Sequence, residues 1–320
     1  MDVNLFKEIV LKATSTYVVP SVHLYNWGEP FLHPELPRLV KIVRECGPEC
    51  YISTNLNVVK NAREVLNACP NTIRISLSGF RQAAYGITHR GGDIELVKNN
   101  MRHLSETART MAASTAIHVF YHRYMTNLDD ELPMRHFAKE LKMGFHPVWA
   151  LLMPVEKVMD YIAQLQGEES ALSDKDMEIV DSLALPLKEA LQAAQFLRHK
   201  PCPFRDGSII INSDGDVQLC CAVYDSRRFG LGPFLQSEPD QLQKLKCEHK
   251  YCGLCMQNGV HIYESFGSFA FDLLAAQKIG PRYANRMFMR AERFKKRIFH
   301  AVPDKVKQVL FNLYTRATQW

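Results

Sequence analysis

Residues 1–155 alternate between short apolar runs and longer segments with helical periodicity. The apolar runs are SVHLYNW (21–27), CYISTN (50–55), TIRISLSG (72–79), TAIHVFYHRYM (115–125) and FHPVWALLM (145–153). Segments such as ELPRLVKIVREC and DIELVKNNMRHLSE lie between them, with apolar residues every three or four positions. Repeated strand–helix alternation predicts a parallel sheet covered by helices, because parallel strands need long crossover connections. The nearly continuous apolar strands indicate a sheet buried on both faces. The predicted fold class is α/β.

Each predicted strand ends in polar or small residues. NWGEP ends the first, STN the second, SLSG the third, and Thr126-Asn127 the fourth. Open α/β sheets and (β/α) barrels bind ligands at the carboxyl ends of their strands. We therefore expect functional residues at these ends, although Ser and Asn are also common in any loop that follows a strand.

Six of the nine cysteines fall within one short region: Cys202, Cys220, Cys221, Cys247, Cys252 and Cys255. A Cys-x2-Cys pair lets two thiolates grip one metal from a tight turn, and Gly253 eases the bend. The turn sequence NSDGD (212–216) predicts a hairpin that brings Cys202 beside Cys220 and Cys221. Four cysteines serve either zinc or an iron–sulfur cluster, and the spacing leaves both open. A metal-free group of buried cysteines is the remaining alternative.

Length and composition favour a cytoplasmic protein of about two domains. The chain has 320 residues, begins with MDVNLFKEIV rather than an apolar leader, and has no apolar run long enough for a membrane span. Thiols stay reduced in the cytosol, so clustered cysteines there indicate metal or redox chemistry. The net charge of +5 is uneven, because residues 281–320 carry ten Lys or Arg against two acids.

Several motifs occur in a fixed order: LYNWGEPFLHPEL, ISTN, IRISLSG, ITHRGGDIELVKNNMRHL, YHRYMTNLDDEL and the cysteine region. Over roughly residues 1–262 this order resembles the radical S-adenosylmethionine enzymes with a C-terminal SPASM-type auxiliary cluster domain. The resemblance implies an incomplete (β/α)6 partial barrel over residues 1–155, with its first strand and cluster loop missing. It further implies a helical connector (156–199), a small cysteine-rich SPASM-like domain (200–262) and a basic helical tail (263–320).

The resemblance also implies cofactor-binding residues. The glutamate matching Glu29 binds the amino group of S-adenosylmethionine, as expected for a carboxylate facing an ammonium group. Residues matching Ser53, Asn55 and Ser76 lie near the ribose and carboxylate of the cofactor, and Asn127 ends the following strand in a similar place. Ser78 stands where many relatives have an aspartate, so this chain departs from the pattern there.

An auxiliary [4Fe–4S] cluster is implied as well. Its expected ligands are Cys202, Cys221, Cys252 and Cys255, with Cys220 and Cys247 as alternates. Adjacent residues of a strand point to opposite faces, so only one of Cys220 and Cys221 is expected to be a ligand. Full SPASM domains hold two clusters, and this chain resembles a reduced, one-cluster form.

The family's defining Cys-x3-Cys-x2-Cys loop should precede the glutamate motif, but the first cysteine of this chain is Cys46. Cys46-x3-Cys50-x2-Ser53 has the spacing with serine in third place, yet it follows Glu29 and is interpreted as turn and strand. Without the loop, this polypeptide is not expected to cleave S-adenosylmethionine reductively. Either Met1 is an internal methionine of a longer protein, which the intact later motifs favour, or the chain is a degenerate binding member.

An intact relative would form a 5′-deoxyadenosyl radical and abstract a hydrogen from a peptide, a protein or a small molecule. Its reductant would be a protein such as flavodoxin or ferredoxin. No catalytic residue can be assigned in this chain from the sequence. The alternative function is a non-catalytic binding protein with a structural four-cysteine zinc site.

Three other patterns give expectations. In the tail, the spacing of Val302, Val306, Val309, Leu310 and Leu313 predicts a helix with one apolar face, packed on the body. A membrane surface or an anionic partner such as RNA is the alternative, although no nucleic-acid motif is present. Ser173 and Asp176 predict a capped helix start, with the helix running towards His199. His118 and His122 should share one strand face, lining a substrate cavity or packing in the core.

Overall fold

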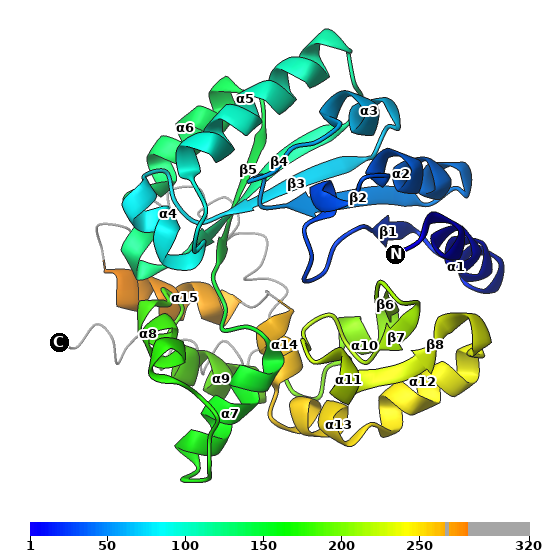
Figure 1. Ribbon diagram of the computed structural model, residues 1–320. Coiled ribbons are helices and arrows are strands. Elements are labelled where there is room, and N and C mark those ends of the chain that lie inside the picture. Colours follow the sequence, from blue (N-terminus) through cyan, green and yellow to red (C-terminus); the bar gives the residue numbers. More distant parts are fainter. Residues whose placement is uncertain (266–268, 281–320) are drawn as a thin grey trace, which may run out of the picture.

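The computed structural model describes residues 1–265 and 269–280 (Figure 1). Its main sheet has five parallel strands in the order β1-β2-β3-β4-β5. Their bounds are β1 (Ser21–His23), β2 (Glu49–Thr54), β3 (Thr72–Leu77), β4 (Ala116–Arg123) and β5 (Gly144–Trp149). The predicted α/β class with a parallel sheet is confirmed.

Helices connect consecutive strands and cover one face of this sheet. They are α2 (Leu36–Glu45), α3 (Ala62–Asn67), α4 (Gln82–Thr88), α5 (Ile94–Thr110) and α6 (Glu131–Glu140). Because crossovers between parallel strands are right-handed, strands laid down in sequential order carry all their helices on the same side. Figure 1 shows this arrangement, a curved partial barrel with α2 to α6 outside the sheet.

The two faces of the sheet differ in chemistry, and the expectation of a sheet buried on both faces holds only for the face that the helices cover. In β3, Ile73, Ile75 and Leu77 are fully buried against the helices, whereas Arg74 and Ser76 point the other way and are partly exposed. The strand register places the remaining residues of this inner face in rows. They are His23, Tyr51, Ser53, His118, Phe120, His122, His146 and Val148. His118 and His122 share one face, as predicted.

The second half of the chain is mainly helical. After β5 come α7 (Val155–Leu165), α8 (Asp174–Ser182), α9 (Leu187–Gln195) and α10 (Pro203–Gly207). The predicted capping box of Ser173 and Asp176 is confirmed at the start of α8. The prediction of a single helix that runs towards His199 is wrong. Helix α8 ends at Ser182, and Pro186 is the N-cap of a second helix, α9, which begins at Leu187.

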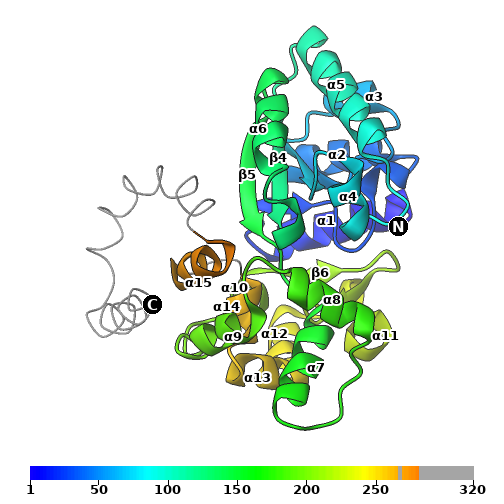
Figure 2. The same cartoon turned by 90° about the vertical axis from the view of Figure 1, so that its left-hand side faces the viewer.

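A small antiparallel sheet follows, with strands β6 (Ile210–Ile211), β7 (Asp216–Gln218) and β8 (Gly230–Pro233). The predicted hairpin at 212–216 is confirmed, with Gly215 at φ +93°. Further helices are α11 (Ser226–Phe229), α12 (Pro239–Glu248), α13 (Lys250–Gln257), α14 (Val260–Glu264) and α15 (Phe269–Ile279). Figure 2 shows α7 to α9 on the opposite side of the molecule from α5 and α6.

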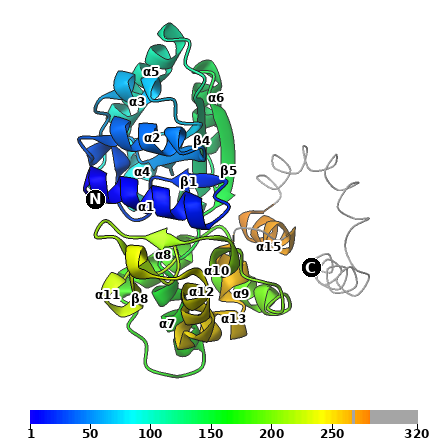
Figure 3. The ribbon, with the colours of Figure 1, turned by 90° about the vertical axis from the view of Figure 1, so that its right-hand side faces the viewer.

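Helix α1 (Val3–Thr16) joins the two halves of the molecule (Figure 3). Asp2 caps it by accepting hydrogen bonds from the first-turn amides. Its Phe6 and Val10 pack into the core of the main sheet, whereas Ile9 packs with Val217 and other buried residues of the cysteine-rich half. Lys12 Nζ also donates hydrogen bonds to the carbonyl oxygens of residues 235 and 237, at 2.9 and 2.7 Å.

Two sequence expectations concern the C-terminal region and the membrane. Residues 281–320, most of the predicted basic tail, lie outside the described residues, so the expectation for that helix stays a prediction. Within the part of the chain that the structure describes, no helix is both long and apolar enough to cross a bilayer.

Gly259 allows a test of how α14 packs on α9. It caps α14 at φ +71°, and an added Cβ would lie 2.9 Å from the backbone of Ala194. We expect Gly259→Ala to lower the free energy of unfolding by about 2 kcal/mol, from left-handed strain and this contact. Gly253→Ala is the matched control, because its Cβ would meet nothing within 4 Å and alanine favours a helix. Urea denaturation measures both, and equal stability of the two variants would contradict the prediction.

Candidate functional site

The carboxylate of Glu29 connects the loops that follow β1 and β2. Its Oε1 accepts a hydrogen bond from the backbone N–H of Phe31 at 3.1 Å, which caps the short 3-10 helix η1 (Pro30–Leu32). Its Oε2 accepts from the N–H of Asn55 at 2.8 Å. Each carboxylate oxygen can accept a further hydrogen bond. The group is thus fixed by the backbone and able to receive a cationic donor.

Ser53, Asn55 and Ser76 lie beside Glu29 at the carboxyl ends of β2 and β3. The hydroxyl oxygens of Ser53 and Ser76 are 3.2 Å apart across the two strands. Asn55 Oδ1 accepts hydrogen bonds from both the backbone N–H and the side-chain amide of Asn57. The structure therefore brings four of the five predicted cofactor residues into one region, and their role as ligands stays a prediction.

Asn127, the fifth predicted cofactor residue, is buried and fully engaged. Its Nδ2 donates to the carbonyl oxygens of Ser78 and His122, both at 2.8 Å. Its Oδ1 accepts from the backbone N–H of Tyr124 at 2.8 Å. Both amide protons are used, so the side chain ties the end of β3 to the end of β4. This placement suits a positioning residue better than a cofactor ligand.

Ser78, which replaces the aspartate of many relatives, is buried in a polar cluster with Thr88 and His89. Its Oγ hydrogen-bonds to the Thr88 hydroxyl and lies 3.1 Å from His89 Nδ1. The His89 ring stacks on Tyr85 with ring centres 4.3 Å apart. Burial lowers the pKa of His89 to about 4, so its imidazole is neutral at pH 7. A neutral serine and a neutral histidine thus occupy the place of the acid.

Two charged residues, one after β3 and one in the middle of it, were missed by the sequence analysis. Asp130 is fully buried and accepts hydrogen bonds from the backbone N–H groups of Phe80 and Arg81, both at 2.9 Å, which fixes the turn after β3. Arg74 lies on the inner face of β3. Its signal was present in TIRISLSG, because a cation at an alternate position of a strand must face away from the apolar core.

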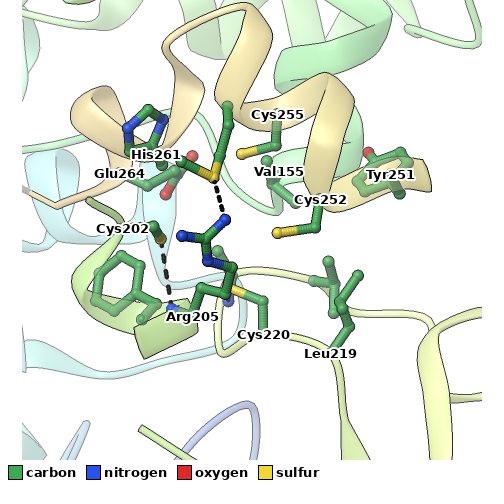
Figure 4. Close-up of a pocket in the computed structure, with 14 residues that line it drawn as sticks. Val155, Cys202, Arg205, Leu219, Cys220, Tyr251, Cys252, Cys255, His261 and Glu264 are labelled. Carbon is green, nitrogen blue, oxygen red and sulfur yellow. Dashed lines mark hydrogen bonds between the residues drawn. The ribbon is translucent and has the colours of Figure 1, made fainter. Parts of the chain in front are cut away.

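Four cysteines line a small cavity in the C-terminal half (Figure 4). Cys202 caps α10, Cys220 follows β7, and Cys252 and Cys255 lie on α13. The free volume between the lining residues is about 30 Å³. These positions come from three separate parts of the chain, and the hairpin of β6 and β7 connects the segments that carry Cys202 and Cys220.

The remaining two cysteines of this region are placed differently. Cys221, named in the expected ligand set, does not line the cavity, and its neighbour Cys220 takes that position. Cys220 Sγ accepts a hydrogen bond from the backbone N–H of Ala222 at 3.4 Å. Cys247 is exposed on α12, where its Sγ accepts from Gln243. The structure therefore favours Cys220 over both.

Arg205 and Met256 also line the cysteine cavity. The guanidinium of Arg205 extends between the thiols (Figure 4), and its Nη1 lies 2.9 Å from Met256 Sδ. Burial raises the pKa of Cys202 and of Cys255, and raises that of Cys252 to about 11. Metal binding would have to remove these thiol protons, and Arg205 would have to leave the space between the sulfurs.

Within the part of the chain that the structure describes, two buried polar atoms at this cavity have no hydrogen-bond partner. They are Oε1 of Glu264 and Nδ1 of His261, both in residues that line the cavity. Burial raises the pKa of Glu264 well above its ordinary value. Unpartnered polar atoms beside four soft thiol ligands fit a group that occupies this space. Among residues 1–265 and 269–280, however, no three His, Cys, Asp or Glu side chains converge closely enough for a single metal ion.

Comparison with known proteins rests on structure. No family model matches the sequence, and no curated protein does. SuiB of Streptococcus suis bound to S-adenosylmethionine superposes with a TM-score of 0.50 at 13% identity, over 80% of this chain and 61% of SuiB. This chain has the radical S-adenosylmethionine fold. It spans about three fifths of the length of SuiB.

Two further structures with the radical S-adenosylmethionine fold are similar. SuiB bound to its precursor peptide SuiA gives a TM-score of 0.49 at 13% identity, over 79% of this chain and 59% of SuiB. The structure of anSMEcpe with bound AdoMet and the Cp18Cys peptide gives 0.49 at 13% identity, over 93% of this chain and 92% of anSMEcpe.

The lowered pKa of His89 predicts a pH-dependent stability. Between about pH 6.5 and 4 the unfolded chain binds a proton here that the folded protein does not, so full stability exists above pH 6.5 and is lost as the pH falls. We expect His89 to account for about 1–2 kcal/mol of the decrease in unfolding free energy between pH 7 and pH 5.

Urea denaturation of the His89→Gln variant at both pH values measures this contribution. The pH dependence should become shallower by that amount. His136→Gln, which replaces an exposed histidine of α6, is the control and should leave the pH dependence unchanged. An unchanged slope in His89→Gln would show that the imidazole already protonates normally in the folded protein.

Proposed function

We propose that this chain binds S-adenosylmethionine at the carboxyl ends of β1 to β3 and holds an auxiliary iron–sulfur cluster in a SPASM-like domain over residues 200–262. It would act within a radical S-adenosylmethionine enzyme that modifies its substrate by hydrogen abstraction. The observation that carries this proposal is the Glu29 carboxylate, which two backbone N–H groups from separate loops hold at the strand ends of this fold.

The residues beside Glu29 suit the chemical groups of S-adenosylmethionine. A fixed carboxylate pairs with the α-ammonium group in a charge-assisted hydrogen bond. The hydroxyls of Ser53 and Ser76 can both donate and accept, as ribose hydroxyls and a carboxylate require. Asn127 acts indirectly, because it holds the ends of β3 and β4 in place.

For the auxiliary cluster we propose Cys202, Cys220, Cys252 and Cys255 as ligands, with Cys220 in place of Cys221. When bound, such a cluster supplies a one-electron centre. The chain itself supplies the four thiolates and a surrounding of buried side chains that excludes water. Arg205, drawn between the thiols in Figure 4, would have to move out of that space, and from beside the cluster its guanidinium would balance part of the negative charge of the thiolates.

The proposal assigns binding of S-adenosylmethionine to this chain but not its cleavage. The three thiolates that hold a catalytic cluster in the family come before the glutamate motif, and the given sequence has no cysteine before Cys46. SuiB has been crystallised with a precursor peptide. A peptide is the substrate class that we propose for this chain as well.

Glu29→Gln tests the cofactor site. Loss of the charge should weaken binding of S-adenosylmethionine about ten- to a hundredfold, because a charge-assisted hydrogen bond contributes about 1.5–3 kcal/mol. Isothermal titration calorimetry on the purified chain measures the change. Glu35→Gln is the matched control, since Glu35 is six residues away and pairs with Arg38. Equal affinity of Glu29→Gln and the parent protein would exclude this carboxylate as a ligand.

Metal analysis of the anaerobically purified chain tests the second site. Iron and acid-labile sulfide should be near-stoichiometric, and lost in Cys252→Ala/Cys255→Ala. Cys220→Ala should lose them as well, whereas Cys221→Ala and the exposed Cys69→Ala should retain them. Zinc without sulfide would instead support the alternative, a binding protein with a structural four-cysteine zinc site.

A further inference from the structure

The inner face of the main sheet holds an arginine that the proposed cofactor site does not use. Arg74 lies in the middle of β3, in register with Ser53 of β2 and His118 of β4. Its guanidinium carbon is 3.9 Å from the centre of the Phe120 ring, at cation–π distance. Its Nε atom is buried and has no hydrogen-bond partner.

No acidic side chain neutralises Arg74 within residues 1–265 and 269–280. Other arginines of this half do have such partners, as Arg123 and Arg135 both pair with Glu131. The Tyr25 hydroxyl interacts electrostatically with Arg74 and hydrogen-bonds to it. The positive charge of Arg74 in turn acts on three histidines of the same face. These histidines are His23, His122 and His146. A partly buried guanidinium without a counter-ion is unfavourable, and an incoming anion would offset that cost.

The side chains around Arg74 are held in place by one another. His146 stacks on Phe120, with ring centres 4.9 Å apart. His146 Nε2 lies 2.9 Å from His118 Nδ1, a hydrogen-bond distance. Gly144 leaves room for the His118 ring, because an added Cβ would lie 2.1 Å from Nδ1. Arg74 therefore stands on a preorganised aromatic surface, which lowers the cost of binding a ligand.

The position of Arg74 along the strand separates it from the proposed cofactor site. Glu29 and Asn55 follow the ends of β1 and β2, whereas Arg74 precedes Ser76 by two residues. Two residues of a strand span about 7 Å, so Arg74 lies deeper in the partial barrel than the strand ends. A molecule bound beside S-adenosylmethionine would meet Arg74 from the inner face.

We propose that Arg74, oriented by Tyr25 and Phe120, binds a carboxylate of the substrate, namely the side chain of an Asp or Glu in a peptide. A guanidinium matches a carboxylate through two parallel hydrogen bonds. This inference rests on the proposed function, because it names the substrate class of the same barrel. The carboxylate of S-adenosylmethionine has the same chemistry, and the experiment separates the two sources.

The test uses affinity selection of capped pentapeptides, each with one Asp or Glu, mixed with matched peptides that carry Asn or Gln. The parent protein should enrich acidic peptides at least tenfold over their amide counterparts. Arg74→Gln should abolish the enrichment, whereas Arg63→Gln, an exposed arginine of α3, should preserve it. Tyr25→Phe, which keeps the ring, should reduce it about three- to tenfold.

Calorimetry with S-adenosylmethionine on the same variants identifies the carboxylate. Arg74→Gln should keep the cofactor affinity within twofold, and a tenfold loss would assign Arg74 to the cofactor and overturn the proposal. Equal enrichment by the parent protein and Arg74→Gln, or none by the parent, would overturn it too. Arg74→Lys, which keeps the charge, guards against misfolding and should retain part of the enrichment.

Failure of the proposed function would give a different result from failure of this inference. If the parent protein bound no S-adenosylmethionine but still enriched acidic peptides through Arg74, the cofactor proposal alone would fail. If it bound S-adenosylmethionine in a Glu29-dependent way but showed no preference for acidic peptides, only the role of Arg74 would fail.

Discussion

The right-handed crossover between parallel strands is the constraint on which the rest of this structure depends. Five strands laid down in sequential order carry every connecting helix on one side. That side buries the apolar half of each strand, such as Ile73 and Ile75. The opposite face receives none of these connecting helices, so it can present Arg74 and several histidines. The division between a structural face and a chemical face follows from chain topology.

Packing contacts with the cysteine-rich half then determine how that half is placed against the main sheet. Helix α1 packs Phe6 into the sheet and Ile9 into the second half, so one helix belongs to both cores. At the strand ends, the indole N–H of Trp27 donates to the carbonyl oxygen of Val223 at 2.8 Å, only a few residues beyond Cys220. The loop after β1 therefore carries Glu29 and also contacts the cysteine region through Trp27. One hydrogen bond thus links the loop that carries Glu29 to the segment that follows Cys220.

Two places in the molecule contain polar groups whose burial is unfavourable in isolation. Within the described residues, Arg74 on the inner face of the main sheet lacks an acidic counter-ion, and Glu264 has an unpartnered oxygen at the cysteine cavity. Proteins rarely retain such groups without a partner, because each costs the desolvation of a polar atom. Glu264 lies at the cysteine region that the sequence motifs single out, and Arg74 lies deeper in the barrel than the strand-end residues, so each gives a physical reason to expect a ligand at its own place. The proposed cluster site and the proposed carboxylate site each contain one of these unpartnered groups.

The sequence by itself determined the α/β class, the strand–helix order, the cap at Ser173 and the hairpin at 212–216, because these depend on local periodicity and turn chemistry. It also located Glu29, Ser53, Asn55 and Ser76 at strand ends. Only the tertiary structure decided that Cys220 rather than Cys221 faces the cavity, since that depends on how the chain leaves a short strand. The engagement of Asn127 and the unpaired charge of Arg74 likewise required the neighbouring strands, because partners distant in sequence determine whether a polar side chain is free to bind.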